Sequence, residues 1–139
     1  GSSSGATSTI LLNGSVTSPT GVSYIYQPGI TAISTAGANT LTIAQLLTEI
    51  ITVTQTAAVT LTLPTGTLMD GGVPSTVTGG TTVAFDWSVI NLGTTSGAVT
   101  MAAGTTHTYV GSTTVAIGTS ARFRSLRSGA TTWITYRLS

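Results

Sequence analysis

Alternation of apolar and polar residues over short distances is the feature that most constrains the fold of this chain. From residue 83 to residue 89 every second residue is apolar, and residues 59–63 alternate in the same way. A period of two places alternate side chains on opposite faces of a β-strand. We therefore expect two half-buried strands here, with Phe85 and Trp87 facing a core and Asp86 facing away from it.

Further short segments of this kind follow, and turns that contain Gly or Ser separate them. The spacing predicts strands over residues 98–101, 106–110 and 114–117. It also predicts a closing hairpin in which residues 121–126 pair with residues 133–138. About eight short strands with almost no helix are typical of a β-sandwich or jelly roll. We expect an all-β fold of antiparallel strands, and because no repeat of 20–50 residues is visible, no solenoid.

Two short segments interrupt the predicted strands. Thr42 and Gln45 have the spacing of a capping box ahead of two leucines, which predicts one or two helical turns ending near Glu49. Residues 68–72 read as a turn or a short helical piece, following the breaker residues Pro64 and Gly66.

The first forty residues differ from the rest of the chain. They carry no charged side chain, and their short apolar pieces lie between Gly, Pro, Ser and Asn. Such a segment buries little within itself. We therefore predict an extended N-terminal arm over residues 1–40, lying along a partner, and a β-sandwich domain over residues 41–139.

The chain carries very little charge. Charged residues make up 5% of it, whereas about 25% is usual, and the formal net charge is +1. Charge repulsion normally keeps proteins apart in solution. This composition favours a protein whose surface is largely covered in an assembly over the alternative, a secreted protein that tolerates low charge. There is no Cys, which excludes disulfides and thiolate metal sites, and no apolar run approaches the ~20 residues of a membrane span.

Catalytic groups are scarce in this sequence. His107 is the only histidine, and it lies in an ordinary strand pattern without a G-x-S-x-G motif. We interpret it as a structural polar residue in preference to a general base. Glu49, Asp70 and Asp86 are the only acids, and their spacing does not indicate a catalytic pair. We expect no enzymatic activity, no cofactor, no metal and no small-molecule substrate.

All four cations lie in the last eighteen residues. On a strand, residues two apart share a face, so the first two arginines project together. Four cations at a net charge of +1 are too few to favour nucleic-acid binding. Arginine suits pairing with carboxylates and carbonyl groups across a protein interface. The predicted interface residues are these arginines and two tyrosines of the arm: Arg122, Arg124, Arg127, Arg137, Tyr24 and Tyr26.

Four segments, in this order and with these gaps, resemble a known family. They read TAAVTLTLPTG at 56–66, FDWSVINLG at 85–93, GTSARFR at 118–124 and WITYRLS at 133–139. This set is similar to small Thr- and Gly-rich virion proteins of tailed bacteriophages, of the capsid decoration (cement) type. The resemblance covers about residues 41–139 and does not clearly cover the arm.

The resemblance implies a β-sandwich or jelly-roll domain that forms a homotrimer. It implies a location on the outer capsid surface, where the trimer stabilises the head by bridging copies of the major capsid protein. It implies no catalytic residues. The arm would then reach along the shell or into a sister subunit.

A second hypothesis is a tail-fibre or receptor-binding β-domain that recognises host glycans, because Thr-rich phage β-proteins of that kind contain similar sequence segments. Its candidate contacts are the aromatic residues Trp87, Trp133, Tyr24, Tyr26 and Tyr109. A small hydrolase built around His107 is the third hypothesis.

Overall fold

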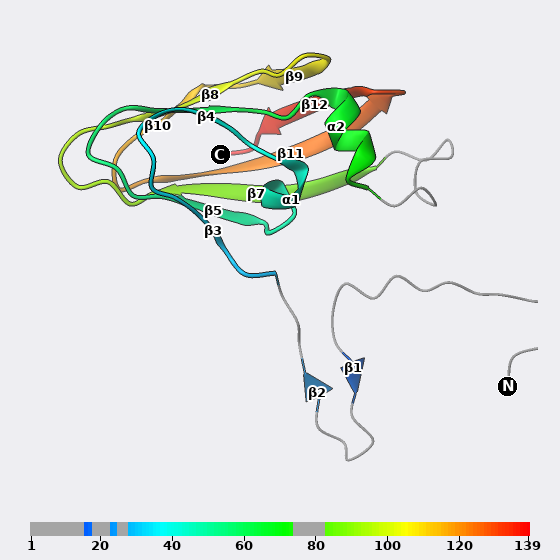
Figure 1. Cartoon of the computed structure of the whole chain (residues 1–139), viewed down its shortest axis with the longest axis horizontal. Coiled ribbons are helices and arrows are strands. Elements are labelled where there is room, and N and C mark those ends of the chain that lie inside the picture. Colours follow the sequence, from blue (N-terminus) through cyan, green and yellow to red (C-terminus); the bar gives the residue numbers. More distant parts are fainter. Residues whose placement is uncertain (1–15, 18–22, 25–27, 74–82) are drawn as a thin grey trace, which may run out of the picture.

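The chain is largely β-structure. A computed structural model describes residues 16–17, 23–24, 28–73 and 83–139. Within them the chain forms twelve strands and two short helices. Ten strands make up two main sheets, and β1 (Val16–Thr17) and β2 (Ser23–Tyr24) form a separate antiparallel pair. Figure 1 shows the two main sheets as neighbouring layers.

The larger sheet has six strands and the smaller sheet has four. In the larger sheet the order is β3 (Thr31–Ile33), β5 (Ile50–Val53), β7 (Ala84–Asn91), β11 (Ser120–Gly129), β12 (Thr132–Arg137) and β9 (His107–Val110). In the smaller sheet it is β10 (Thr114–Val115), β8 (Val99–Ala102), β6 (Val59–Thr62) and β4 (Gly37–Thr40).

Many of the strand pairs are parallel, which corrects the prediction of an antiparallel fold. The chain passes repeatedly from one sheet to the other, so that β3, β5 and β7 lie side by side in parallel. The strands β4, β6 and β8 do the same in the smaller sheet. Three successive coils therefore stack as they do in a β-helix. The two helices lie in the segments that connect successive coils, and no repeat in the sequence reveals the coils.

Within the two main sheets, antiparallel pairing is confined to the later strands. β11 pairs with β7 on one side and with β12 on the other, and β10 pairs with β8. The predicted closing hairpin is thus confirmed, although β12 also pairs in parallel with β9. A jelly roll is built from antiparallel strands, so this mixed pairing differs from the predicted topology.

The sheets begin earlier than the predicted domain boundary. Residues 31–33 and 37–40 form β3 and β4, which pair with β5 and β6. These strands belong to the two sheets, so this end of the predicted arm is corrected. Most of the remaining arm, including Tyr26, lies outside the described residues.

One hydrophobic core joins the two sheets. Its buried side chains come from both, including Leu61 and Met101 of the smaller sheet and Trp87, Phe123 and Trp133 of the larger one. The rings of Trp87 and Phe123 lie 4.5 Å apart between centroids. The alternation along β7 is confirmed, since Trp87 and Val89 are buried while Asp86, Ser88 and Ile90 are only partly buried.

Both helices are short; the first begins as the sequence predicts, and the second begins two residues before the predicted segment 68–72. The capping box is present at α1 (Ile43–Leu46), where Thr42 Oγ1 accepts from Gln45 N and Gln45 Oε1 accepts from Thr42 N. The second helix, α2 (Gly66–Gly71), has Thr65 as its N-cap. Figure 1 shows α2 at one end of the sheets, near β12.

The start of α2 lies very close to the turn of the β11–β12 hairpin. A Cβ atom on Gly66 would come within 1.9 Å of the Thr131 carbonyl oxygen and 2.7 Å of Thr106 Oγ1. Only glycine allows this approach. Gly66 therefore fixes the position of α2, and with it Asp70, against the hairpin.

Candidate functional site

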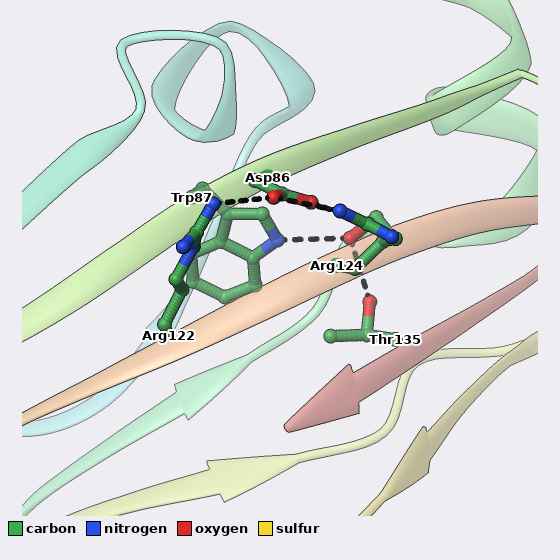
Figure 2. A network of polar contacts seen from close by, with 6 residues as sticks. Asp86, Trp87, Arg122, Arg124 and Thr135 are labelled. Atoms are coloured by element: carbon green, nitrogen blue, oxygen red, sulfur yellow. Dashed lines mark hydrogen bonds and ion pairs between the residues drawn. The ribbon is translucent and has the colours of Figure 1, made fainter. Parts of the chain in front are cut away.

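The outer face of the larger sheet, which points away from the core, carries a cluster of three charged side chains. Asp86 on β7 lies opposite Arg124 on β11, and Arg122 lies two positions further along, opposite Ser88. Arg124 binds the carboxylate with two hydrogen bonds, Nε to Oδ1 at 2.6 Å and Nη2 to Oδ2 at 3.0 Å. Arg122 Nη2 donates to Oδ2 at 2.7 Å. Figure 2 shows Asp86 held between the two guanidinium groups.

This cluster is exposed, and it orients two guanidinium groups. The side chains of Arg122 and Arg124 are 60% and 53% exposed, so solvent screens the ion pairs and they add little to stability. The hydrogen bond from Arg124, followed by that from Arg122, lowers the pKa of Asp86 against the opposing effect of burial. An ionised Asp86 cannot serve as a general acid at neutral pH, so the arrangement suits recognition better than proton transfer.

Apolar side chains adjoin the cluster on the outer face. Tyr136 pairs with Arg124 across β11 and β12, and Val110 on β9 pairs with Tyr136. Tyr136 is 37% exposed and Val110 is 44% exposed. Arginine and tyrosine beside aliphatic groups are enriched in protein–protein interfaces. The outer face thus combines oriented donors with an apolar surface.

An open hollow lies at the edge of the cluster. It has a volume of about 520 Å³, and its lining residues are Glu49, Ala84, Phe85, Asp86 and Arg124. Glu49 has a φ of 71°, in the left-handed region that non-glycine residues seldom adopt. Its carbonyl oxygen accepts a 2.8 Å hydrogen bond from Ser88 N, which holds this conformation. Such backbone strain is concentrated at functional sites in proteins.

Arg127 takes part in an internal contact at the other end of β11. Its guanidinium binds Asp70 of α2 through Nε and Nη2, at 2.9 Å and 3.1 Å. The Asp70 carboxylate also accepts from Thr131 N and from Trp133 Nε1. The bond from Arg127 is the largest cause of a strongly lowered Asp70 pKa. With side chains only 17% and 20% exposed, this ion pair joins α2 to the hairpin.

Arg137 also binds within the chain. Its Nη1 donates to the carbonyl oxygens of Ser112 and Thr114 at 2.9 Å and 2.6 Å, and its Nε donates to Ser139 O. It thereby ties β12 to the segment that leads into β10. Of the four arginines, then, only Arg122 and Arg124 come together on one exposed face. Tyr24 lies in β2, and nothing of its side chain is described.

The aromatic residues predicted to contact glycans are largely internal. Trp87 and Trp133 are 1% and 0% exposed, which excludes them as a surface platform and corrects that prediction. Tyr109 is half-buried against Phe123, and its hydroxyl donates to Ser112 O. Burial, opposed by Arg137, raises the Tyr109 pKa.

His107 is buried and bonded at both ring nitrogens. Its Nδ1 lies 2.7 Å from Pro64 O, and its Nε2 lies 2.7 Å from Thr135 Oγ1. Burial lowers the His107 pKa, opposed by the Pro64 carbonyl. At 1% exposure the ring is closed to a substrate, in line with the structural interpretation.

Local patterns in the sequence did not indicate three features of the site. Glu49 lies beside Asp86, and Asp70 binds Arg127, but these residues meet only through strand pairing and helix packing. The carboxylates that bind the arginines were expected across an interface, whereas Asp86 and Asp70 lie in the same chain. The alternation of β7 and β11 could have indicated the contact of Asp86 with Arg122 and Arg124, since both strands place these charges on their outer face.

No group of three or more His, Cys, Asp or Glu side chains lies together among the described residues. None of the helices in the described part of the chain has the length and apolar character needed to span a bilayer. Comparison with protein-family models, with curated proteins and with solved structures finds no match.

Proposed function

We propose that this chain is a structural virion protein, a capsid decoration (cement) protein without enzymatic activity. In this proposal it forms a homotrimer on the outer surface of a phage head and stabilises the head by bridging major capsid proteins. Contacts that exist only in the assembled shell favour the assembled state by mass action. The proposal also includes a finer point of fold, that the two sheets pack face to face as a β-sandwich.

One observation carries this proposal. On the outer face, Asp86 holds Arg122 and Arg124 in fixed orientations beside exposed Tyr136 and Val110. Pre-oriented guanidinium groups lose less conformational freedom when they bind carboxylates or carbonyl groups of a partner. The low charge of the chain and the sequence resemblance support the same function.

The test is a double substitution, Arg122→Ala with Arg124→Ala. We expect a smaller assembly by light scattering and weaker binding to purified phage heads, with little change in the urea midpoint. Leu68→Ala is the control, because Leu68 is 58% exposed on α2, away from the outer face. A wild-type chain that stays monomeric and leaves the heat stability of the heads unchanged would rule the proposal out.

A second candidate function is favoured by the hollow beside Phe85. A hollow that has two carboxylates and a guanidinium among its lining residues has groups able to hold a sugar. In this case the chain is a tail-fibre or receptor-binding domain. Glycan-array binding that Glu49→Ala abolishes, together with labelling of tails in micrographs, would favour this function over the first.

A further inference from the structure

A continuous chain of buried hydrogen bonds crosses the larger sheet and ends on the smaller one. Trp87 Nε1 donates to Ser125 Oγ at 2.9 Å, and Ser125 Oγ lies 2.8 Å from Thr135 Oγ1. Thr135 in turn contacts His107, and His107 contacts Pro64 O just after β6. Figure 2 shows the part of this chain from Trp87 to Thr135. Its side chains are 0% to 1% exposed.

The groups at the two ends of this hydrogen-bond chain, Trp87 Nε1 and Pro64 O, fix the direction of every hydrogen bond in it. A carbonyl oxygen only accepts, so His107 Nδ1 carries the proton that binds Pro64 O. Neutral Nε2 therefore accepts from the Thr135 hydroxyl. Thr135 Oγ1 then accepts from Ser125, which itself accepts from the Trp87 indole. All four links form with every hydroxyl proton donated only when His107 is neutral and in the Nδ1–H form.

Protonation of His107 is incompatible with this arrangement. A proton on Nε2 must donate to Thr135 Oγ1, so the Thr135 hydroxyl loses the acceptor for its own proton. If that proton turns toward Ser125, the Ser125 proton is displaced instead, so one of the two buried hydroxyls has no acceptor among the described residues. A buried hydroxyl without an acceptor and a buried charge each cost free energy.

No charged side chain of the surrounding strands offsets that cost. On β7 and β11, Asp86, Arg122 and Arg124 bind one another on the outer face, and Arg127 binds Asp70 of α2. The other charged or titratable groups of β12 and β9 are Tyr136, Arg137 and Tyr109. Tyr136 lies on the outer face, and Arg137 and Tyr109 bind backbone carbonyl groups.

We propose that this hydrogen-bond chain is a proton-sensitive latch that joins edge strand β9 to β12 and to the Pro64 turn. When His107 gains a proton, the latch opens and β9 separates from the sheet edge. The inference does not rest on the proposed virion function, and it is tested on the isolated protein.

The composition of the chain makes this test specific. The protein has one histidine, no cysteine and three acids, so between pH 5 and pH 7 His107 is the only side chain with an ordinary pKa in that range. Because the folded-state pKa of His107 is lowered, its contribution to stability is present above the unfolded value of 6.5 and falls as the pH drops below it.

The experiment measures urea unfolding from pH 7.5 to pH 5, with His107→Gln as the matched neutral variant. Gln can still donate to Pro64 O and accept from Thr135. In the wild type we expect the unfolding constant to rise toward about tenfold per pH unit below pH 6.5. In the variant this rise should vanish. A flat wild-type profile, or an equal slope in the variant, would overturn the latch.

Two measurements on the wild type keep the proposal testable if the variant does not fold. The ¹⁵N chemical shifts of the imidazole ring should show the Nδ1–H tautomer at pH 7.5, and an Nε2–H ring would contradict the direction of the chain. Hydrogen-exchange protection, corrected for the intrinsic rate, should fall in β9 at pH 5.5 before it falls in β7 or β11. Uniform loss of protection would also argue against a local latch.

Discussion

The two aspartates of this protein make similar bonds in different surroundings. Asp70 accepts hydrogen bonds from Arg127, Thr131 and Trp133 at a junction between a helix and a hairpin. Among the described residues, Asp86 accepts only from two exposed arginines. At the scale of the residue, the ion pairs differ in how far the arginine is buried. The mostly buried pair of Arg127 and Asp70 helps to hold the fold together, whereas the exposed pairs of Asp86 orient side chains on the surface.

Replacement of the two aspartates should reveal this difference. Asp70→Asn should cost about 2 kcal/mol at pH 7, because one carboxylate satisfies four donors there. Asp86→Asn is the matched control and should cost less than about 1 kcal/mol. Urea unfolding of both variants measures these values, and equal losses would refute the distinction.

The lowered pKa of Asp70 predicts how the stability of the protein changes in acid. Since the folded-state pKa of Asp70 is lowered below its ordinary 3.8, the stability that ionised Asp70 provides is present above that value and is lost as the pH falls below it. The stability difference between wild type and Asp70→Asn should therefore shrink below about pH 3.8. A difference that persists unchanged to pH 2 would show that the charge of Asp70 contributes nothing.

At the scale of the element, the sequence predicts strands better than it predicts their partners. The alternation of β7 and the capping box of α1 follow from local patterns, and both are confirmed. Alternation looks the same in parallel and antiparallel strands, so the pairing of β3, β5 and β7 could not be read from it. Alternation does predict that Arg122 and Arg124 share one face. Their contact with Asp86 depends on the register between β7 and β11, which local patterns do not determine.

Glycine substitutions in α2 test how closely this helix packs. Gly66→Ala places a methyl group against the Thr131 carbonyl and should cost about 3 kcal/mol. Gly71→Ala, in the same helix, meets nothing within 4 Å and should raise stability by up to about 1 kcal/mol. Thermal unfolding of the two variants provides the comparison, and a harmless Gly66→Ala would contradict the close approach.

At the scale of the whole molecule, the outer face is a surface on which charge and apolar groups meet. Its apolar part includes Val110 and Tyr136, and its polar part is the cluster around Asp86. A protein with so little charge elsewhere has few other means of selecting a partner. The proposed assembly therefore depends on this face more than on any exposed leucine of the loops and helices.

A charge introduced on the outer face should disrupt assembly. Val110→Lys places an ammonium group in the apolar part of that face, and we expect loss of the oligomer in sedimentation and loss of binding to phage heads. Leu68→Lys adds the same charge on α2 and should leave both unchanged. If the two variants behave alike, net charge and not the outer face controls association.

The position of β11 has a consequence for the order of folding. It lies between β7 and β12, and β9 reaches the sheet only through β12. The larger sheet therefore cannot be completed until residues 120–137 have been synthesised, although β9 precedes them in the chain. Pairings between strands so distant in sequence are slow to form. On the ribosome, the edges of β7 and β9 would stay open for the whole of that interval, so nascent chains would be vulnerable to pairing with one another.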